Sequence, residues 1–199
     1  QRLARNLHDD LGSLLTSAKL DAARIKSRIT VAAPEALDLL AHLVGTLNTG
    51  IALGRRIIED LRPSSLSNLG LVAALEILAR EYAAQSGVAV HCQLEPVALR
   101  PSAELVVYRL VQEAITNIAK YAQARTIWIE LCTRAGQVEV SVRDDGVGFD
   151  TSTKPTSAYG LVGMRFRVGA EGGSLQLQSR PGQGTQILAK FPPLSTDAG

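Results

Sequence analysis

Residues 137–149 read QVEVSVRDDGVGF, and this stretch decides which kind of fold the second half of the chain can adopt. Val138, Val140 and Val142 alternate with polar residues, as in a strand that buries one face. The strand ends at Arg143, and a segment with two aspartates and two glycines follows it. Such a segment is usually only a turn, but a carboxylate at a strand end can also accept a hydrogen bond from an exocyclic amine. The stretch therefore predicts a half-buried strand that leads into a candidate ligand-binding loop.

Strand and helix periods recur on both sides of this stretch. We expect helices over residues 69–86, 101–122 and 161–171. We expect strands over residues 88–94, 126–133, 137–143, 174–180 and 184–191. Helices and a mostly antiparallel sheet in one domain imply a two-layer α/β sandwich.

The first 61 residues follow a helical period throughout, in two runs with Pro34 between them. Proline cannot continue a helix but can open the next one. Apolar or small residues recur every three or four positions, at Leu3, Leu7, Leu11, Leu14, Ala18, Ala22, Ile25 and Ile29, and at Leu37, Leu40, Val44, Leu47, Ile51, Gly54, Ile58 and Leu61. The pattern predicts an antiparallel helical hairpin. Because a lone hairpin buries too little surface, we expect a homodimer with a four-helix bundle; the alternative is packing on the chain's own C-terminal half.

The segment Pro63-Ser64-Ser65 has the composition of a short linker. We therefore predict a hairpin domain over residues 1–62, an α/β domain over 63–194 and a frayed tail over 195–199. The start without Met suggests a fragment, with no signal peptide and no apolar run long enough to cross a membrane. We expect a cytoplasmic fragment and leave open a membrane anchor in a longer parent protein.

Composition and charge exclude several classes of protein. Hydrophobic residues make up 46% of the chain, which is enough for a core and argues against global disorder. The net charge is +2 without a basic stripe, and only 4% of residues are aromatic, so we expect no direct nucleic-acid partner. Cys92 and Cys132 lack metal-site spacing, and we expect buried free thiols in a reducing compartment.

Three further segments could bind a ligand, although each alone has an ordinary structural explanation. Glu113, Asn117 and Lys120 share one helix face, where they could hold Mg²⁺ and a phosphate chain, or simply face solvent. Residues 160–164 (GLVGM) come just before a short helix, whose N-terminal N–H groups attract phosphate. Residues 182–185 (GQGT) enter the last strand, where the alternative is a hairpin turn.

The order of these segments is more specific than any one of them. The order of the segments resembles the ordered boxes of the GHKL (Bergerat-type) ATPases. It begins with a helix that carries Asn117, continues with the DDGVG turn and with GLVGM before a helix, and ends with GT before a strand. That superfamily covers histidine kinases, gyrase, Hsp90 and MutL. Residues 2–12 (RLARNLHDDLG) resemble the phosphoacceptor box of the NarX/DesK-like sensor histidine kinases of two-component systems, and residues 61–75 resemble their linker. The resemblance covers residues 1–192, and the other GHKL proteins lack the histidine-bearing hairpin.

This resemblance implies a protein histidine kinase that autophosphorylates His8 from Mg-ATP. The phosphoryl group would pass to an aspartate of a response regulator with a helix-turn-helix output domain. The resemblance also implies Asp9 as the acid beside the histidine, whereas the residues alone do not choose between Asp9 and Asp10. Gly12, one turn after His8, would leave room for a bulky phosphate donor.

The same resemblance implies a nucleotide site in the α/β domain. Asp144 would accept from the adenine amine, Gly148 would let the base approach, and Thr185 would lie at the base edge. Gly160 and Gly163 would cap the phosphates through backbone N–H groups. The implied ATP-binding residues are Asn117, Lys120, Tyr121, Asp144, Gly146, Gly148, Gly160, Leu161, Gly163, Met164 and Thr185, with Asn117 and Glu113 for Mg²⁺ and Glu113 also catalytic.

The sequence departs from the family pattern at a few positions. Ser13 stands where many members have a Gln that orients the water for dephosphorylation of the regulator, so we predict weak or absent phosphatase activity. Tyr121 stands where relatives often have His, and Phe166 replaces an acid, where it could pack beneath a lid or contact the hairpin. Two other functions compete with a kinase: a dimeric adaptor that binds nucleotide without phosphoryl transfer, and a GHKL ATPase that acts as a conformational clamp.

Overall fold

The computed structural model describes residues 12–28, 34–61, 63–151 and 158–194. The chain divides into two compact units, Gln1–Ser67 and Asn68–Gly199, and each is described by itself. No helix among the described residues is both long enough and apolar enough to cross a membrane.

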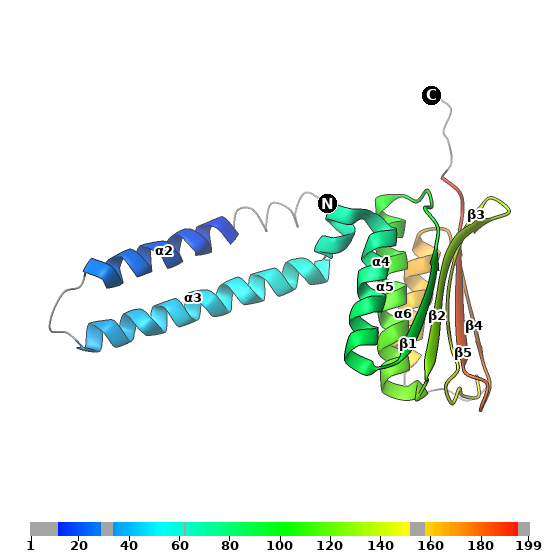
Figure 1. Cartoon of the computed structure of the whole chain (residues 1–199). Coiled ribbons are helices and arrows are strands. Elements are labelled where there is room, and N and C mark those ends of the chain that lie inside the picture. Colours follow the sequence, from blue (N-terminus) through cyan, green and yellow to red (C-terminus); the bar gives the residue numbers. More distant parts are fainter. Residues whose placement is uncertain (1–11, 29–33, 62, 152–157, 195–199) are drawn as a thin grey trace, which may run out of the picture. The chain divides into compact units, whose positions relative to one another are not determined.

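The first unit contains the predicted hairpin. Helices α2 (Gly12–Arg28) and α3 (Pro34–Leu61) lie side by side and run in opposite directions (Figure 1). Pro34 begins the second helix, as its missing N–H allows at a first turn. The seam positions Ala22, Leu40 and Gly54 are buried. The predicted seam residues Leu3, Leu7, Leu11 and Ile29 lie outside the described residues.

The hairpin leaves much of its apolar surface uncovered. The exposed side chains are Leu14 (67%), Leu20 (56%), Ile25 (51%) and Leu43 (47%). Exposed apolar side chains on both helices are typical of a hairpin that supplies only half of a helical bundle.

The predicted linker at Ser64 and Ser65 is wrong, because both residues lie in helix α4 (Ser64–Ser86). The N–H of Ser67 donates to the carbonyl of Pro63 at 3.1 Å, so the first turn forms directly after the proline. The break lies instead at Gly70, which interrupts the helix with a φ of 81°. Only glycine adopts this conformation without a steric penalty.

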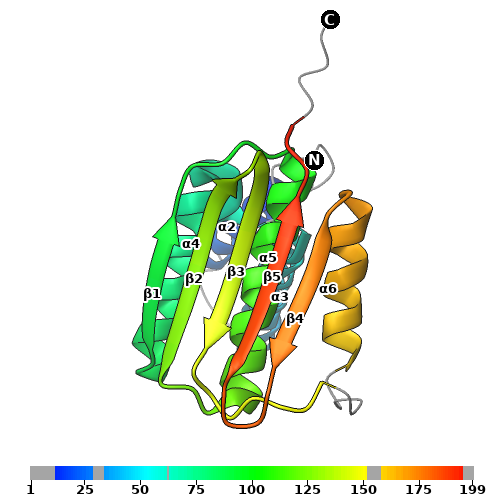
Figure 2. The ribbon, with the colours of Figure 1, turned by 90° about the vertical axis from the view of Figure 1, so that its right-hand side faces the viewer.

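The second unit is a two-layer α/β sandwich, as predicted. Its strands are β1 (Ala89–Leu94), β2 (Thr126–Arg134), β3 (Gln137–Asp144), β4 (Ser174–Ser179) and β5 (Thr185–Phe191). They form one sheet in the order β1-β2-β3-β5-β4, in which only the β1–β2 pair is parallel. Helices α4, α5 (Pro101–Asn117) and α6 (Ala158–Ala170) cover the same face of the sheet (Figure 2).

The alternation seen in residues 137–143 positions the core. Val138, Val140 and Val142 point toward the helices and are at most 2% exposed. The same core contains buried apolar side chains of the neighbouring strands and of the helices, including Val107, Leu110, Val111, Ile127, Ile129, Leu131, Met164, Val168, Ala189 and Phe191. Each fully buried side chain of this size contributes roughly 1.5–3 kcal/mol. Because Asp144 is two residues beyond Val142, the same alternation turns its side chain inward.

The helix predicted over residues 101–122 changes its geometry before it ends. It continues from α5 into a π-helical turn, Ile118–Ala122, which stops at Gln123 with a left-handed φ of 51°. Single π-helical turns are frequent at functional sites. Here the turn directs the carbonyl of Ala122 to the loop after β3, where it accepts from the N–H of Val147 at 2.7 Å.

Both cysteines are free, as predicted. Cys92 is exposed rather than buried because it lies on the edge strand β1. Burial of part of the thiol nevertheless raises the pKa of Cys92, and the charge of Glu76 raises it further.

Candidate functional site

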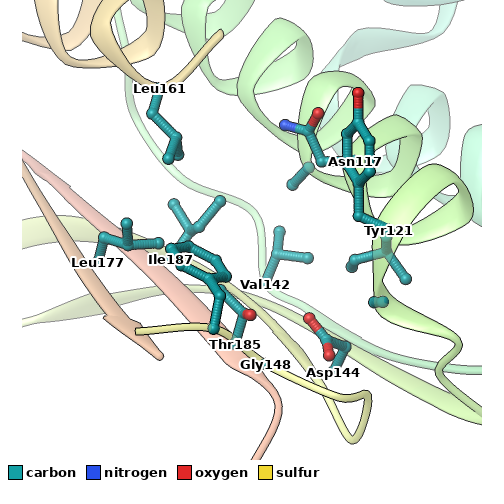
Figure 3. Close-up of a pocket in the computed structure, with 13 residues that line it drawn as sticks. Asn117, Tyr121, Val142, Asp144, Gly148, Leu161, Leu177, Thr185 and Ile187 are labelled. Atoms are coloured by element: carbon teal, nitrogen blue, oxygen red, sulfur yellow. The ribbon is translucent and has the colours of Figure 1, made fainter. Parts of the chain in front are cut away.

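A cavity of about 270 Å³ opens in the second unit, where α5 and its π-helical turn face the sheet. Its lining comes from several segments far apart in the sequence (Figure 3). The lining residues are Ala114, Asn117, Ile118, Tyr121, Ala122, Val142, Asp144, Gly148, Phe149, Leu161, Leu177, Thr185 and Ile187. Apolar walls with few polar groups are typical of a site for a flat organic ligand.

Asp144 supplies the single carboxylate of this lining. The side chain is only 3% exposed, and its Oδ1 accepts from the N–H of Gly146 at 2.8 Å. Burial raises the pKa of Asp144, and hydrogen bonds from the backbone N–H groups of Gly146 and Thr185 partly offset the increase. The carboxylate is therefore held in place with acceptor capacity directed into the cavity.

The neighbouring Asp145 has a different role. Its Oδ1 accepts from the backbone N–H groups of Arg125 and Thr126 at 2.8 and 2.9 Å. The hydrogen bond from Thr126 is the main reason that the pKa of Asp145 is lowered. Asp145 thus fastens the loop to the start of β2, while Asp144 faces the cavity.

Gly146 and Gly148 allow this loop to pack against backbone. A Cβ atom on Gly146 would clash with the carbonyl of Ala122. Gly148 has a φ of 58°, and a Cβ atom there would clash with the carbonyl of Arg180 and lie 2.7 Å from that of Gly184. Gly148 does line the cavity, but its missing side chain makes room for the 180–184 turn rather than for a ligand.

Gly160 lies close to Glu113 and Asn117, so three predicted residues meet at one place. A Cβ atom on Gly160 would be 2.6 Å from Oε1 of Glu113 and 3.9 Å from Nδ2 of Asn117. The carboxylate of Glu113 and the amide oxygen of Asn117 are oxygen ligands of the kind that Mg²⁺ binds. Phosphate oxygens usually complete the coordination shell of the ion. The residues present therefore fit a magnesium ion that binds together with phosphate.

Helix α6 begins at Ala158, which is earlier than predicted. Gly160 is its third residue, and Gly163 lies further inside the helix, where an N–H group normally pairs with the carbonyl four residues before it. Contact of either N–H group with a phosphate stays a prediction.

Met164 and Lys120 are also absent from the lining of the described cavity. The Met164 side chain is 1% exposed and forms part of the core. Lys120 is exposed on the π-helical turn, and its contact with a phosphate chain stays a prediction.

The lining also includes residues that were not predicted as site residues from the sequence: Ala114, Ile118, Ala122, Val142, Phe149, Leu177 and Ile187. Val142 and Ile187 carry a sequence signal, since both occupy inward positions of alternating strands. Ile118 and Ala122 have none, because their position depends on the π-helical turn. Leu161 and Tyr121, two of the predicted nucleotide-binding residues, line the cavity, and Tyr121 is 59% exposed at its rim. Phe166 is 77% exposed, and nothing in the described part of the chain covers it.

The predicted phosphoacceptor His8, its neighbour Asp9 and the predicted phosphatase position Ser13 belong to the first unit. His8 and Asp9 lie outside the described residues. Ser13 is in the first turn of α2, but its side chain is not among those described.

Asp144→Asn is expected to raise the free energy of unfolding at neutral pH, because a neutral amide avoids the desolvation cost of a buried carboxylate. The folded-state pKa of Asp144 is above its ordinary value, so wild-type stability falls as pH rises between the two values. The advantage of the variant should therefore be larger at pH 7 than below about pH 4. Urea unfolding at both pH values measures this.

Asp145→Asn is the matched control, and we expect it to change the free energy of unfolding at pH 7 in the opposite direction. The folded-state pKa of Asp145 is lowered, so its stabilising contribution is present above the ordinary pKa and disappears as pH falls through the folded-state value. This variant should be less stable than the wild type at pH 7. Equal effects of both substitutions at both pH values would contradict the assignment.

Two family models match the chain. The model described as histidine kinase matches residues 1–66. The model described as histidine kinase-, DNA gyrase B-, and HSP90-like ATPase matches residues 102–195.

Curated relatives agree with this pair of models. The signal transduction histidine-protein kinase/phosphatase DegS of Brevibacillus brevis is 30% identical over 196 residues, which are 96% of this chain and 50% of that protein. The sensor histidine kinase LiaS of Bacillus subtilis (strain 168) is 29% identical over 205 residues, 100% of this chain and 55% of that protein. The chain thus spans about half the length of these relatives.

Solved structures share the fold. The histidine kinase domain of the Erythrobacter litoralis EL346 blue-light activated histidine kinase gives a TM-score of 0.58 at 19% identity, over 90% of this chain and 94% of that one. The Acinetobacter baumannii histidine kinase AdeS gives a TM-score of 0.54 at 16% identity, over 91% and 96%. With a histidine kinase model over its hairpin and a histidine kinase-type ATPase model over its α/β unit, the chain belongs to the sensor histidine kinases, of the NarX/DesK-like kind.

Proposed function

We propose that this chain is the cytoplasmic core of a two-component kinase, which phosphorylates His8 from Mg-ATP and passes the phosphoryl group to an aspartate of a response regulator. The regulator would carry a helix-turn-helix output domain, so the kinase itself would not touch DNA. The cavity carries the proposal: a buried, hydrogen-bonded Asp144 lies at one end, and Leu161 lies at the other (Figure 3).

The cavity suits the base of the nucleotide. Its volume of about 270 Å³ is slightly below the roughly 300–1,000 Å³ of pockets that hold drug-sized ligands, so one ring system fits and a triphosphate would extend outward. Apolar side chains would cover the ring faces, and the Asp144 carboxylate would accept from the adenine amine. Tyr121 at the rim could stack on the base or reach a phosphate.

The phosphate chain would follow the cavity toward α6. The backbone N–H of Gly160, near the N-terminus of α6, would attract an anion. Glu113 and Asn117 would hold or orient Mg²⁺, which would offset the negative charge of the phosphates. Lys120 would approach the same phosphates from the exposed side of the π-helical turn.

His8 would be the nucleophile. Asp9 would accept from the Nδ1–H of the imidazole and leave Nε2 unprotonated at neutral pH. As the bond from Nε2 to the γ-phosphorus forms, the bond to the bridging oxygen breaks and ADP leaves. Gly12 would leave space for the donor beside the ring.

A second copy of the chain would complete the hairpin. The exposed Leu14, Leu20, Ile25 and Leu43 would then pack in a four-helix bundle, which supports the proposed homodimer.

Incubation with γ-labelled ATP and Mg²⁺ tests the kinase directly. We expect acid-labile, alkali-stable label on the wild-type chain and at least a hundredfold loss in His8→Gln. His42→Gln is the matched control, because this histidine is exposed on α3 and has no proposed role. Label that persists in His8→Gln would refute the kinase assignment.

Two other outcomes of this experiment have their own meaning. Nucleotide binding without label on the protein would favour the dimeric adaptor. ATP hydrolysis without label would favour the conformational clamp.

Leu43→Lys is expected to dissociate the homodimer, since it places a charge where a half-exposed leucine would be buried by the partner copy. Loss of the leucine contact alone costs roughly 1.5–3 kcal/mol per copy. Sedimentation velocity at micromolar concentration measures the change, with Asp38→Lys, an exposed position on the same helix, as the control. A wild-type monomer would refute the dimer.

Ser13 is expected to leave the chain with little phosphatase activity, because serine is shorter than the glutamine of many relatives. The phosphorylated regulator should keep its phosphate with wild-type protein and ADP present, and Ser13→Gln should accelerate its loss. Ser17→Gln, one turn later on α2, controls for an added amide. Rapid dephosphorylation by the wild-type chain would overturn this expectation.

A further inference from the structure

Ser179 makes three short polar contacts at the edge of the cavity, although it does not line it. It is the last residue of β4 and lies directly opposite Thr185, the first residue of β5. Its Oγ accepts from the N–H of Phe149 at 2.9 Å and donates to the carbonyl of Gly184 at 3.0 Å. The third contact, also 3.0 Å, joins Ser179 Oγ to Oγ1 of Thr185.

Counting protons fixes the direction of this third hydrogen bond. A serine hydroxyl has one proton to donate and two lone pairs that can accept. A carbonyl oxygen can only accept, so the Ser179 proton goes to Gly184, whose buried position makes an unpaired carbonyl costly. One lone pair of Ser179 is occupied by the Phe149 N–H. The remaining lone pair must then accept from the hydroxyl of Thr185.

Thr185 therefore has no proton left to offer to a ligand. Its hydroxyl oxygen lines the cavity beside Asp144, which also receives the backbone N–H of Thr185 (Figure 3). Both groups at this end of the cavity present acceptors. A ligand edge with an amino group can donate to them, whereas an edge with a carbonyl oxygen would face two acceptors and leave its own acceptor unpaired.

We propose that Ser179 is a specificity-determining positioning residue: by accepting the Thr185 proton it keeps that hydroxyl an acceptor and makes the cavity select 6-aminopurines over 6-oxopurines. The inference rests on the proposed nucleotide site and adds to it the origin of base selection. Ser179 acts through Thr185 and does not touch the base.

ATP and ITP test the idea because they differ only at one edge of the base, where ITP has a carbonyl oxygen in place of the six-amino group of ATP and a proton on N1. We expect the wild-type chain to bind ATP more tightly, and Ser179→Ala to reduce the ratio of the ITP to the ATP dissociation constant by roughly 3–10-fold, the effect of one hydrogen bond. Freed from Ser179, Thr185 can turn its proton into the cavity and accommodate the carbonyl. Titration calorimetry with each Mg-nucleotide measures both constants on the whole chain.

Matched variants separate positioning from loss of structure. Ser179→Thr keeps the hydroxyl and should retain the wild-type ratio, and Ser174→Ala removes an exposed serine from the same strand without effect. Thr185→Val should lower the ratio, and adding Ser179→Ala to it should lower it no further, because both act through one hydroxyl. If Ser179→Ala does not fold, Ser179→Thr and Thr185→Val still decide the question.

An equal loss of ATP and ITP affinity in Ser179→Ala, with the ratio unchanged, would show that the hydroxyl only holds the loop and would overturn the inference. Nucleotide binding by the wild type would then still support the proposed function. A wild-type chain that binds neither nucleotide would instead overturn the proposed function, and the inference with it.

Discussion

A buried carboxylate imposes the main constraint on the second unit. Asp144 is 3% exposed, and its charge is tolerable there only because backbone N–H groups of Gly146 and Thr185 donate to it. Those donors belong to the loop after β3 and to the start of β5, so the carboxylate requires both segments to be in place. Burial works against the stability of the domain and at the same time gives the cavity a strong, fixed acceptor.

The loop that holds Asp144 is fastened on three sides. Asp145 ties it to β2, the Ala122 carbonyl ties it to the π-helical turn, and Ser179 ties Phe149 to β4. The two glycines of the loop permit these close approaches, since a side chain on either would meet backbone. A rigid rim around an apolar cavity is a physical basis for discrimination between bases, because donors and acceptors that cannot rearrange penalise a mismatched ligand.

The two units would have different roles in the proposed reaction. The α/β unit has an extensive core and a site built from backbone and side-chain contacts, whereas few of the described apolar side chains of the hairpin are buried in a single chain. The proposed nucleotide binding would thus be a property of one folded unit, while presentation of His8 would depend on association of two hairpins. This difference suits a protein in which the phosphate donor and the acceptor must meet and separate.

The sequence by itself determined the strand and helix pattern, the side of the sheet that Asp144 faces and the pairing of a hairpin with an ATPase-like domain, because periodicity and the order of motifs depend only on local sequence. Tertiary structure decided the rest. The earlier start of α6 placed Gly160 and Gly163 within a helix, the π-helical turn brought Ile118 and Ala122 into the lining, and Gly148 proved necessary for the 180–184 turn. Such features depend on where a helix begins or widens and on which backbone segments meet, and neither is encoded in the spacing of residues along the chain. The direction of the Ser179–Thr185 hydrogen bond likewise follows only from partners that the folded sheet brings together.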